Sequence, residues 1–373
     1  MLLPDVSALA NVIFKEIDKA GPMPFVRFME LALYCPDLGF YERFPHRIGR
    51  RGDFYTSVSV GPLLGRMLAF HFSRWLGELE SAGGRWQLVE AGAHDGQLAV
   101  DILTWLKEHA PGTFDRLDYL ILEPSGRRES WQRARLSELG FGGRWIRSWS
   151  DLPAGSLRGV VFSNELLDAF PARRYGWDAQ ARRWFEYGVD LRQGQLVWCR
   201  LPPTVDGESG SPPEVPAPIR SMLPDGFVVE CVPEARRWWR QAAAALGGGC
   251  LMTIDYGFDR AVALDPTRPQ GTLRAYREHR LVSDLLADPG EQDLTGHVDF
   301  AALREVGEAG GLRTETLVTQ GRFLTGVMEQ IVRLRAPGFD WSRAARSQFQ
   351  TLTHPEHLGD RFKVLIQYVA GTA

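Results

Sequence analysis

Short apolar runs alternate with helical periods through the middle of the chain, and this alternation predicts a parallel α/β sheet. From Trp86 onward, each run ends in small or acidic residues and is followed by apolar residues at helical spacing. The runs are Trp86–Glu90, Tyr119–Glu123, Gly159–Ser163 and Cys250–Asp255. We therefore expect these four segments to be the buried strands of one sheet.

Two other regions have a different pattern. Residues 1–82 carry apolar positions at helical spacing, interrupted by loops, and predict an N-terminal helical cap. The segments Arg173–Trp177, Trp184–Val189 and Gln195–Leu201 resemble antiparallel strands joined by polar turns. The expected organisation is a cap over 1–82 and a catalytic domain over 83–373, with a β-rich insertion at about 172–232.

Composition removes several classes of protein from consideration. The 373 residues are 44% hydrophobic and 24% charged, as in an ordinary globular protein, and the net charge is −3. Such a charge gives no general attraction to nucleic acid. No apolar stretch is long enough for membrane insertion, no signal pattern opens the chain, and the four cysteines are scattered. We expect a cytoplasmic location; the oligomeric state stays open.

The first strand runs into a glycine turn that is a candidate ligand site. Glu90, Gly92, His94 and Gly96 follow one another there, before a helical period begins at Leu98. Glycine lets the backbone approach a ligand that a Cβ atom would push away. Glu123 ends the next strand, where an acid can accept hydrogen bonds from both hydroxyls of a ribose. An ordinary strand-to-helix connection, and an acid at a helix N-terminus, are the alternatives.

The chemistry of this turn favours a cationic cofactor over a dinucleotide. The turn reads G-x-x-x-G, whereas a dinucleotide site needs G-x-G-x-x-G, and Glu90 would repel a pyrophosphate. S-adenosylmethionine carries a ribose and a positive sulfur, so it suits two acids beside a glycine turn. A nicotinamide-dependent oxidoreductase is the less favoured alternative.

A third strand delivers Asn164, Glu165 and Asp168 to the carboxyl edge of the sheet, where ligands of open α/β sheets bind. Buried acids need a compensating partner, which a ligand or basic substrate can supply. The alternative is that Asn164 caps a helix and Asp168 is solvated. Asp255 ends the fourth strand and is a further catalytic candidate, whereas His297 is more simply a structural hydrogen-bonding group. No metal site is expected.

Several of these motifs together resemble the MidA family of class I S-adenosylmethionine-dependent methyltransferases. The segments that carry the resemblance are Met29–Tyr34, Gly39–Tyr41, Gly52–Ser57, Glu90–Gly92, Asn164–Pro171, Asp255–Gly257 and Asp293–Thr295. They occur in the family's order and span nearly the whole chain. The resemblance implies a Rossmann-like, seven-stranded methyltransferase sheet with an N-terminal helical cap and an antiparallel insertion.

The resemblance also implies S-adenosylmethionine as cofactor and methylation of an arginine in a protein, such as a respiratory complex subunit. The residues expected to bind the cofactor are Asp53, Tyr55, Thr56, Glu90, Gly92, His94, Gly96, Glu123 and Asn164. Glu165, Asp168 and Asp255 are the expected catalytic residues, with Glu165 and Asp168 orienting the guanidinium.

One departure separates this chain from the family pattern. The family reads E-x-G-P-G-x-G in the cofactor loop, whereas Ala93 and His94 replace its proline and middle glycine here. Histidine tolerates positive φ, so we expect the turn to survive and the cofactor to bind. A non-catalytic assembly or scaffold protein that kept the fold is the alternative.

Overall fold

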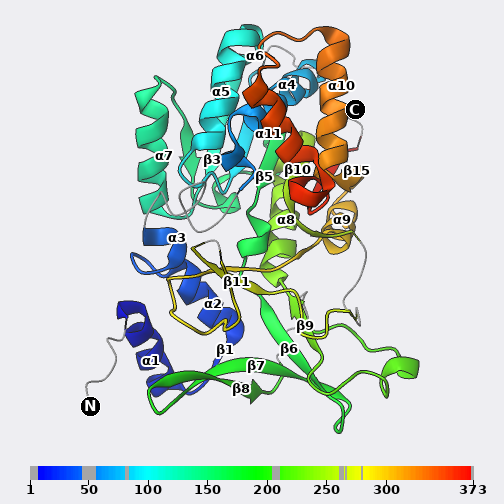
Figure 1. Ribbon diagram of the computed structural model, residues 1–373. Coiled ribbons are helices and arrows are strands. Elements are labelled where there is room, and N and C mark those ends of the chain that lie inside the picture. Colours follow the sequence, from blue (N-terminus) through cyan, green and yellow to red (C-terminus); the bar gives the residue numbers. More distant parts are fainter. Residues whose placement is uncertain are drawn as a thin grey trace. The chain divides into compact units, whose positions relative to one another are not determined.

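The structure, a computed structural model, describes residues 7–43, 56–79, 84–203, 211–259, 264, 267–278 and 280–370 (Figure 1). The chain divides into two compact units. The first comprises Met1–Phe44, Leu167–Arg237 and Ala261–Val298, and the second comprises Pro45–Leu166, Trp238–Arg260 and Asp299–Ala373.

The second unit is built on one mixed sheet. Its strands are β2 (Trp86–Ala91), β3 (Leu117–Leu122), β4 (Arg144–Ile146), β5 (Leu157–Asn164), β10 (Leu246–Phe258), β15 (Leu312–Thr319) and β16 (Phe362–Val369). They lie in the order β15-β16-β10-β5-β2-β3-β4, and a short eighth strand, β14 (Val298–Asp299), pairs with β10. The predicted α/β sheet and the four predicted strands are confirmed.

Strand direction decides where the candidate residues meet. β4, β3, β2, β5 and β10 are parallel neighbours, whereas β16 is antiparallel to both β10 and β15. The chain runs outward from β2 through β3 to β4 and then returns to β5 on the other side of β2. The carboxyl ends of β2 and β5 therefore form the switch point at which such sheets bind ligands.

Helices cover both faces of this sheet. They are α4 (Leu63–Glu78), α5 (Gln97–His109), α6 (Pro111–Phe114), α7 (Gly126–Glu138), α8 (Pro233–Ala245, shared between the units), α9 (Phe300–Ala309), α10 (Gln320–Leu334) and α11 (Arg343–Thr353). Along β16, Val364 and Ile366 join the apolar core with α4, α5 and α10. Gln367 points to the other face, where it accepts a hydrogen bond from Trp239 Nε1 at 2.8 Å.

The first unit is antiparallel. Its main sheet contains β1 (Met23–Pro24), β6 (Arg173–Asp178), β7 (Arg183–Arg192), β8 (Gln195–Leu201) and β9 (Val228–Cys231). Its other elements are α1 (Ala8–Ala20), α2 (Phe25–Tyr34), α3 (Phe40–Arg43) and a small sheet of β11 (Arg274–Arg277), β12 (Arg280–Val282) and β13 (Asp293–Thr295). The three antiparallel strands predicted from the sequence are confirmed as β6, β7 and β8.

Each compact unit contains segments that are far apart in the sequence. Residues 1–44 share a unit with 167–237 and 261–298, whereas α4 belongs with the large sheet. Compactness alone does not show which segments fold independently. The cap over 1–82 and the insertion at about 172–232 therefore stay predictions.

Candidate active site

The glycine turn after β2 is left-handed at three positions. Gly92 has φ 74°, His94 has φ 47° and Gly96 has φ 85°. A Cβ atom on Gly92 would lie 2.8 Å from Leu166 Cδ1, so this turn packs directly against the segment that follows β5. The turn survives with an imidazole at its centre, as expected from the tolerance of histidine for positive φ.

The His94 ring lies beside α7. Its Nδ1 is 3.8 Å from Asp95 Oδ1, and its centroid is 6.4 Å from the ring of Trp131 in an edge-on arrangement. Asp95 in turn accepts the backbone N–H of Gln97 at 3.1 Å and pairs with Arg135 at 2.8 Å. Polar contacts therefore hold the turn at the start of α5.

Glu90 is a buried carboxyl inside β2, two residues before Gly92. Tyr119, on the neighbouring strand β3, donates its hydroxyl to Glu90 Oε2 at 2.5 Å. Burial raises the pKa of Glu90 to about 7, although the Tyr119 hydrogen bond opposes this rise. A positive ligand charge nearby would favour the ionised form, so Glu90 is suited to a cationic cofactor.

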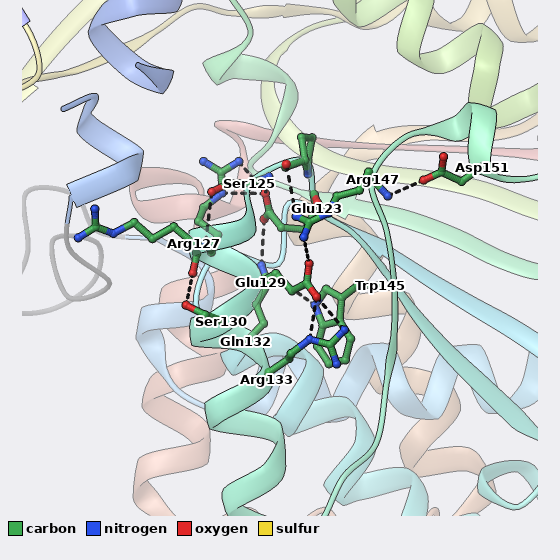
Figure 2. A network of polar contacts seen from close by, with 12 residues as sticks. Glu123, Ser125, Arg127, Glu129, Ser130, Gln132, Arg133, Trp145, Arg147 and Asp151 are labelled. Atoms are coloured by element: carbon green, nitrogen blue, oxygen red, sulfur yellow. Dashed lines mark hydrogen bonds and ion pairs between the residues drawn. The ribbon is translucent and has the colours of Figure 1, made fainter. Parts of the chain in front are cut away.

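Glu123, directly after β3, is only 1% exposed and is held by α7 (Figure 2). Its Oε1 accepts the backbone N–H of Ser125 at 2.9 Å and two N–H groups of Arg128 at 3.0 and 2.7 Å. Ser125 caps α7 by accepting the backbone N–H of Arg128. Glu123 is thus an acid at a helix N-terminus, which agrees with the alternative interpretation. Its Oε2 accepts fewer hydrogen bonds than Oε1 and is the oxygen with room for a ribose hydroxyl.

Gln132 is a residue of this site that the sequence analysis missed. It lies on α7, fully buried, and its Nε2 donates to Glu123 Oε2 at 2.9 Å and to the carbonyl oxygen of His94 at 3.0 Å. Its Oε1 accepts from Trp145 Nε1 at 2.8 Å (Figure 2). Its place on the buried face of α7, four residues before Leu136, is the only signal in the sequence.

Glu165 follows β5 and has a left-handed backbone, with φ 53°. Its N–H donates to the carbonyl oxygen of Ile254 at 2.9 Å. Its Oε1 accepts both the backbone N–H of Ser57 at 2.8 Å and Asn164 Nδ2 at 3.1 Å. Burial raises the pKa of Glu165 to about 7, although hydrogen bonds from the backbone and side chain of Ser57 and from Asn164 oppose this rise.

Asn164 carries an acceptor that has no partner in the described part of the chain. Its side chain is buried, at 9% exposure, and Oδ1 has no hydrogen bond, whereas Nδ2 is used by Glu165. The helix that Asn164 was alternatively expected to cap is only a 3-10 turn, Leu167–Ala169. Because a buried acceptor without a donor is costly, Oδ1 is a candidate to accept a hydrogen bond from a ligand.

Asp255 is fully buried in β10 and binds backbone groups around the site. Its Oδ2 accepts the N–H of Leu166 at 3.1 Å, and its Oδ1 accepts the N–H of Tyr256 at 2.8 Å. Asp255 therefore stabilises the turn after β5, next to Glu165.

Asp168 and His297 belong to the first unit. Asp168 is buried rather than solvated, and its carbonyl oxygen accepts the N–H of Gly296 at 2.8 Å. His297 Nδ1 lies 2.9 Å from Arg268 Nη1, and burial and nearby arginines lower its pKa to about 4. His297 is thus a neutral structural group, and the pairing of Asp168 with Glu165 stays a prediction.

The remaining predicted cofactor residues lie before α4. Asp53 and Tyr55 are outside the described residues. Thr56 and Ser59 form a reciprocal turn: each backbone N–H donates to the other's hydroxyl oxygen at 3.1 Å. This turn fixes the backbone on both sides of Ser57, the residue that donates to Glu165.

Comparison with known proteins decides the family. Residues 67–318 match the family described as "Putative S-adenosyl-L-methionine-dependent methyltransferase". The chain belongs to this family. The nicotinamide-dependent alternative is therefore not supported, and the expected methyltransferase fold is confirmed.

Named relatives and a solved structure agree with this assignment. The chain is 29% identical to "Protein arginine methyltransferase NDUFAF7 homolog, mitochondrial" of Caenorhabditis elegans, over 79% of this chain and 70% of that one. It is 25% identical to the Homo sapiens protein of that name, covering 96% and 82%. A Burkholderia thailandensis crystal structure bound to S-adenosyl-homocysteine has TM-score 0.81 and 31% identity, covering 100% of this chain and 96% of that one.

The relatives correct one expectation. Those from Caenorhabditis elegans, Drosophila melanogaster and Homo sapiens are all named as mitochondrial, which contradicts the predicted cytoplasmic location. Scattered cysteines indicate a reducing environment, but they do not distinguish one reducing compartment from another. Among the described residues, no helix is long and apolar enough to cross a membrane.

Proposed function

We propose that this methyltransferase transfers the methyl group of S-adenosylmethionine to a guanidinium nitrogen of an arginine in a protein substrate. The names of the NDUFAF7 relatives support arginine as the acceptor. The resemblance to the MidA family suggests a respiratory complex subunit as the protein that carries it.

The observation that carries the proposal is the pair of acceptors at the end of β5. Asn164 Oδ1 is buried without a hydrogen-bond partner among the described residues. The Ser57 N–H and Asn164 Nδ2 both donate to Glu165 Oε1, so among the described residues Oε2 is the oxygen with room for a ligand. A guanidinium presents five N–H donors in a fixed plane, so it can bind Glu165 Oε2, while Asn164 Oδ1 can accept a hydrogen bond from the cofactor.

The glycine turn and its neighbours fit the cofactor. Gly92 and Gly96 have no side chains to keep the methionine part of the cofactor away from the backbone, and Glu90 favours its positive charge. Glu123 Oε2 accepts a hydrogen bond from Gln132, its one such partner in the part of the chain that the structure describes, and can also receive a ribose hydroxyl. His94, Asn164, Thr56, Asp53 and Tyr55 complete the proposed cofactor site. When bound, the cofactor supplies an electrophilic methyl group on a positively charged sulfur.

The protein's own contribution is mainly positioning. Glu165, with Asp168 as its proposed companion, orients the guanidinium so that one nitrogen faces the methyl group. The new N–C bond would form as the methyl–sulfur bond of the cofactor breaks, with its electron pair staying on the sulfur. The methylated nitrogen then has a proton to lose, and Glu165 Oε2 is the proposed acceptor. Asp255 keeps the turn after β5 in place through its bonds to Leu166 and Tyr256.

A labelled-methyl assay tests this function. Extracts of a strain lacking the protein would be incubated with the purified protein and labelled S-adenosylmethionine, and labelled arginine would be identified after protein hydrolysis. The Glu165→Gln variant is expected to bind the cofactor normally, by titration calorimetry, but to lose at least 90% of the transfer. Full activity of that variant would remove Glu165 from the site. Label on a residue other than arginine would reject the arginine proposal. No label on any residue would also reject it and would support the alternative of a non-catalytic assembly or scaffold protein.

A further inference from the structure

The backbone of Glu165 needs support from outside its own strand. At φ 53°, a residue with a side chain is in a conformation that costs energy and persists only where surrounding contacts fix it. Its N–H bond to Ile254 fixes one side of the residue. The carboxylate is fixed by Ser57, which is 108 positions away in the sequence.

Ser57 connects Glu165 with Gln320 of α10 through two hydrogen bonds. It is completely buried, with its backbone N–H on Glu165 Oε1 and its hydroxyl donating to Gln320 Oε1 at 3.3 Å. The reciprocal turn of Thr56 and Ser59 restricts the same backbone. The direction of the Ser57 N–H therefore depends on the turn and on Gln320.

Gln320 is fixed at both ends of its side-chain amide. It is the first residue of α10, completely buried, and its Nε2 donates to the carbonyl oxygen of Leu352 at 2.9 Å, near the end of α11. The two helices approach closely here, since a Cβ atom on Gly321 would lie 2.5 Å from the carbonyl oxygen of Thr353. This close approach leaves Gln320 little room to move.

We propose that Gln320 is a positioning residue for catalysis: through Ser57 it keeps Glu165 Oε1 occupied and so leaves Oε2 directed at the substrate nitrogen. This inference rests on the proposed role of Glu165. No contact of Gln320 with substrate or cofactor is involved, so its removal changes the reacting geometry only through Ser57.

The pKa of Glu165 depends on the hydrogen bond from the Ser57 N–H, so a change in that pKa indicates a change in this contact. The Ser57 N–H stabilises the carboxylate and so opposes the rise in pKa that burial causes. Asp255, on β10, is the charged group that acts on Glu165 from the packed elements, and it raises the pKa further. Loosening the Ser57 contact therefore moves the pKa of Glu165 upward, and with it the acidic limb of the pH–rate profile.

The test compares Gln320→Ala with a matched variant, Gln367→Ala. Gln367 is also a fully buried glutamine of the second unit, with side-chain bonds to Trp239, Arg304 and Thr314, none of them part of the site. We expect Gln320→Ala to lower kcat at least tenfold, to change the Kd of S-adenosylmethionine less than twofold, and to move the acidic limb up by half a pH unit or more. Gln367→Ala is expected to lower thermal stability but to leave that limb in place.

A double-variant cycle removes the ambiguity of a folding defect. Ser57→Ala keeps the backbone N–H bond to Glu165 but removes the hydroxyl, which contacts Gln320 and also stabilises the Glu165 carboxylate, so a shift in the same direction is expected. In the Ser57→Ala background, Gln320→Ala should lower kcat no further, because Gln320 acts on Glu165 only through the Ser57 hydroxyl. Additive losses, or an acidic limb that does not move in Gln320→Ala, would overturn the inference. Glu165→Gln and the labelled-methyl assay, measured in parallel, separate this failure from failure of the proposed function: full activity of Glu165→Gln removes Glu165 from the site, whereas absence of labelled arginine with the parent protein rejects the function itself.

Discussion

The side-chain amide of Gln132 donates a hydrogen bond to Glu123 Oε2 at 2.9 Å. The same nitrogen donates to the carbonyl oxygen of His94 at 3.0 Å. One residue of α7 thus connects the end of β3 with the turn after β2, the two places where the cofactor is proposed to bind. Helix, strand end and glycine turn are therefore expected to respond together when this amide is removed.

Gln132→Ala is the direct test of that connection. It removes the partner of the buried Glu123 Oε2, at a cost of about 1–3 kcal/mol, and the partner of the half-buried His94 carbonyl oxygen and Trp145 indole N–H, at a smaller cost. We expect a lower free energy of unfolding by denaturant titration and about tenfold weaker binding of S-adenosylmethionine. Gln367→Ala serves as control, with a similar loss of stability and unchanged binding. Equal binding by both variants would show that the Gln132 bridge is structural only.

Glu123→Ala is expected to weaken cofactor binding at least tenfold in titration calorimetry, because it removes the proposed ribose acceptor. The structure adds a complication, since the same substitution removes the carboxylate that pairs with Arg128 at 2.7 Å. A buried charge that loses its partner destabilises the protein.

The variant Glu123→Ala/Arg128→Ala separates the two effects of losing this carboxylate. It should recover part of the lost stability, measured as Tm, without recovering affinity. Recovery of both would mean that Glu123 acts on the cofactor only by holding α7.

His94 offers a test of the unusual cofactor turn. His94→Gly removes a side chain from a position at φ 47° and restores the glycine of the family pattern, so the turn should form without strain. We expect cofactor binding at least as tight as in the parent protein. His94→Val places a β-branched residue at positive φ and should lower both Tm and affinity. Weaker binding by His94→Gly would instead assign the imidazole a direct contact with the cofactor.

Glu90 predicts a pH dependence whose sign follows from burial. Its pKa rises from the ordinary 4.5 to about 7, so the folded state favours the protonated form. The stabilisation is complete below about pH 4.5 and is lost as the pH rises through 7. Glu90→Gln should therefore have a higher Tm than the parent at pH 8.5, by about 2 °C or more, and little advantage at pH 5.

Ionisation of Glu90 at higher pH lowers the stability of the protein but should increase its affinity for the cofactor. Binding of S-adenosylmethionine is expected to strengthen between pH 5.5 and 8 as Glu90 ionises, and to be weak and nearly independent of pH in Glu90→Gln. Asp101, Glu165 and Glu230, whose pKa values are also raised, are present in both proteins, so their contributions cancel in the comparison. A steep pH dependence that persists in Glu90→Gln would assign the titration to one of them.

The amino-acid sequence by itself determined the sheet and the residues at its edge. Apolar runs ending in an acid or amide are local patterns, and parallel strands necessarily bring their carboxyl ends to one edge. This is why Glu90, Glu123, Asn164 and Asp255 were identified without coordinates. The motifs near Gly92 and Asn164 were also sufficient to indicate the family, which the comparisons confirmed.

Only the tertiary structure decided how those residues are held. Gln132 and Gln320 have no distinctive local pattern, because a buried glutamine is recognised by its partners, and Ser57 and Gln320 are 263 positions apart. The left-handed backbone of Glu165 likewise depends on contacts from distant segments. Hydrogen bonds between such segments form only when packing brings them together, so a pattern read along the chain does not contain them.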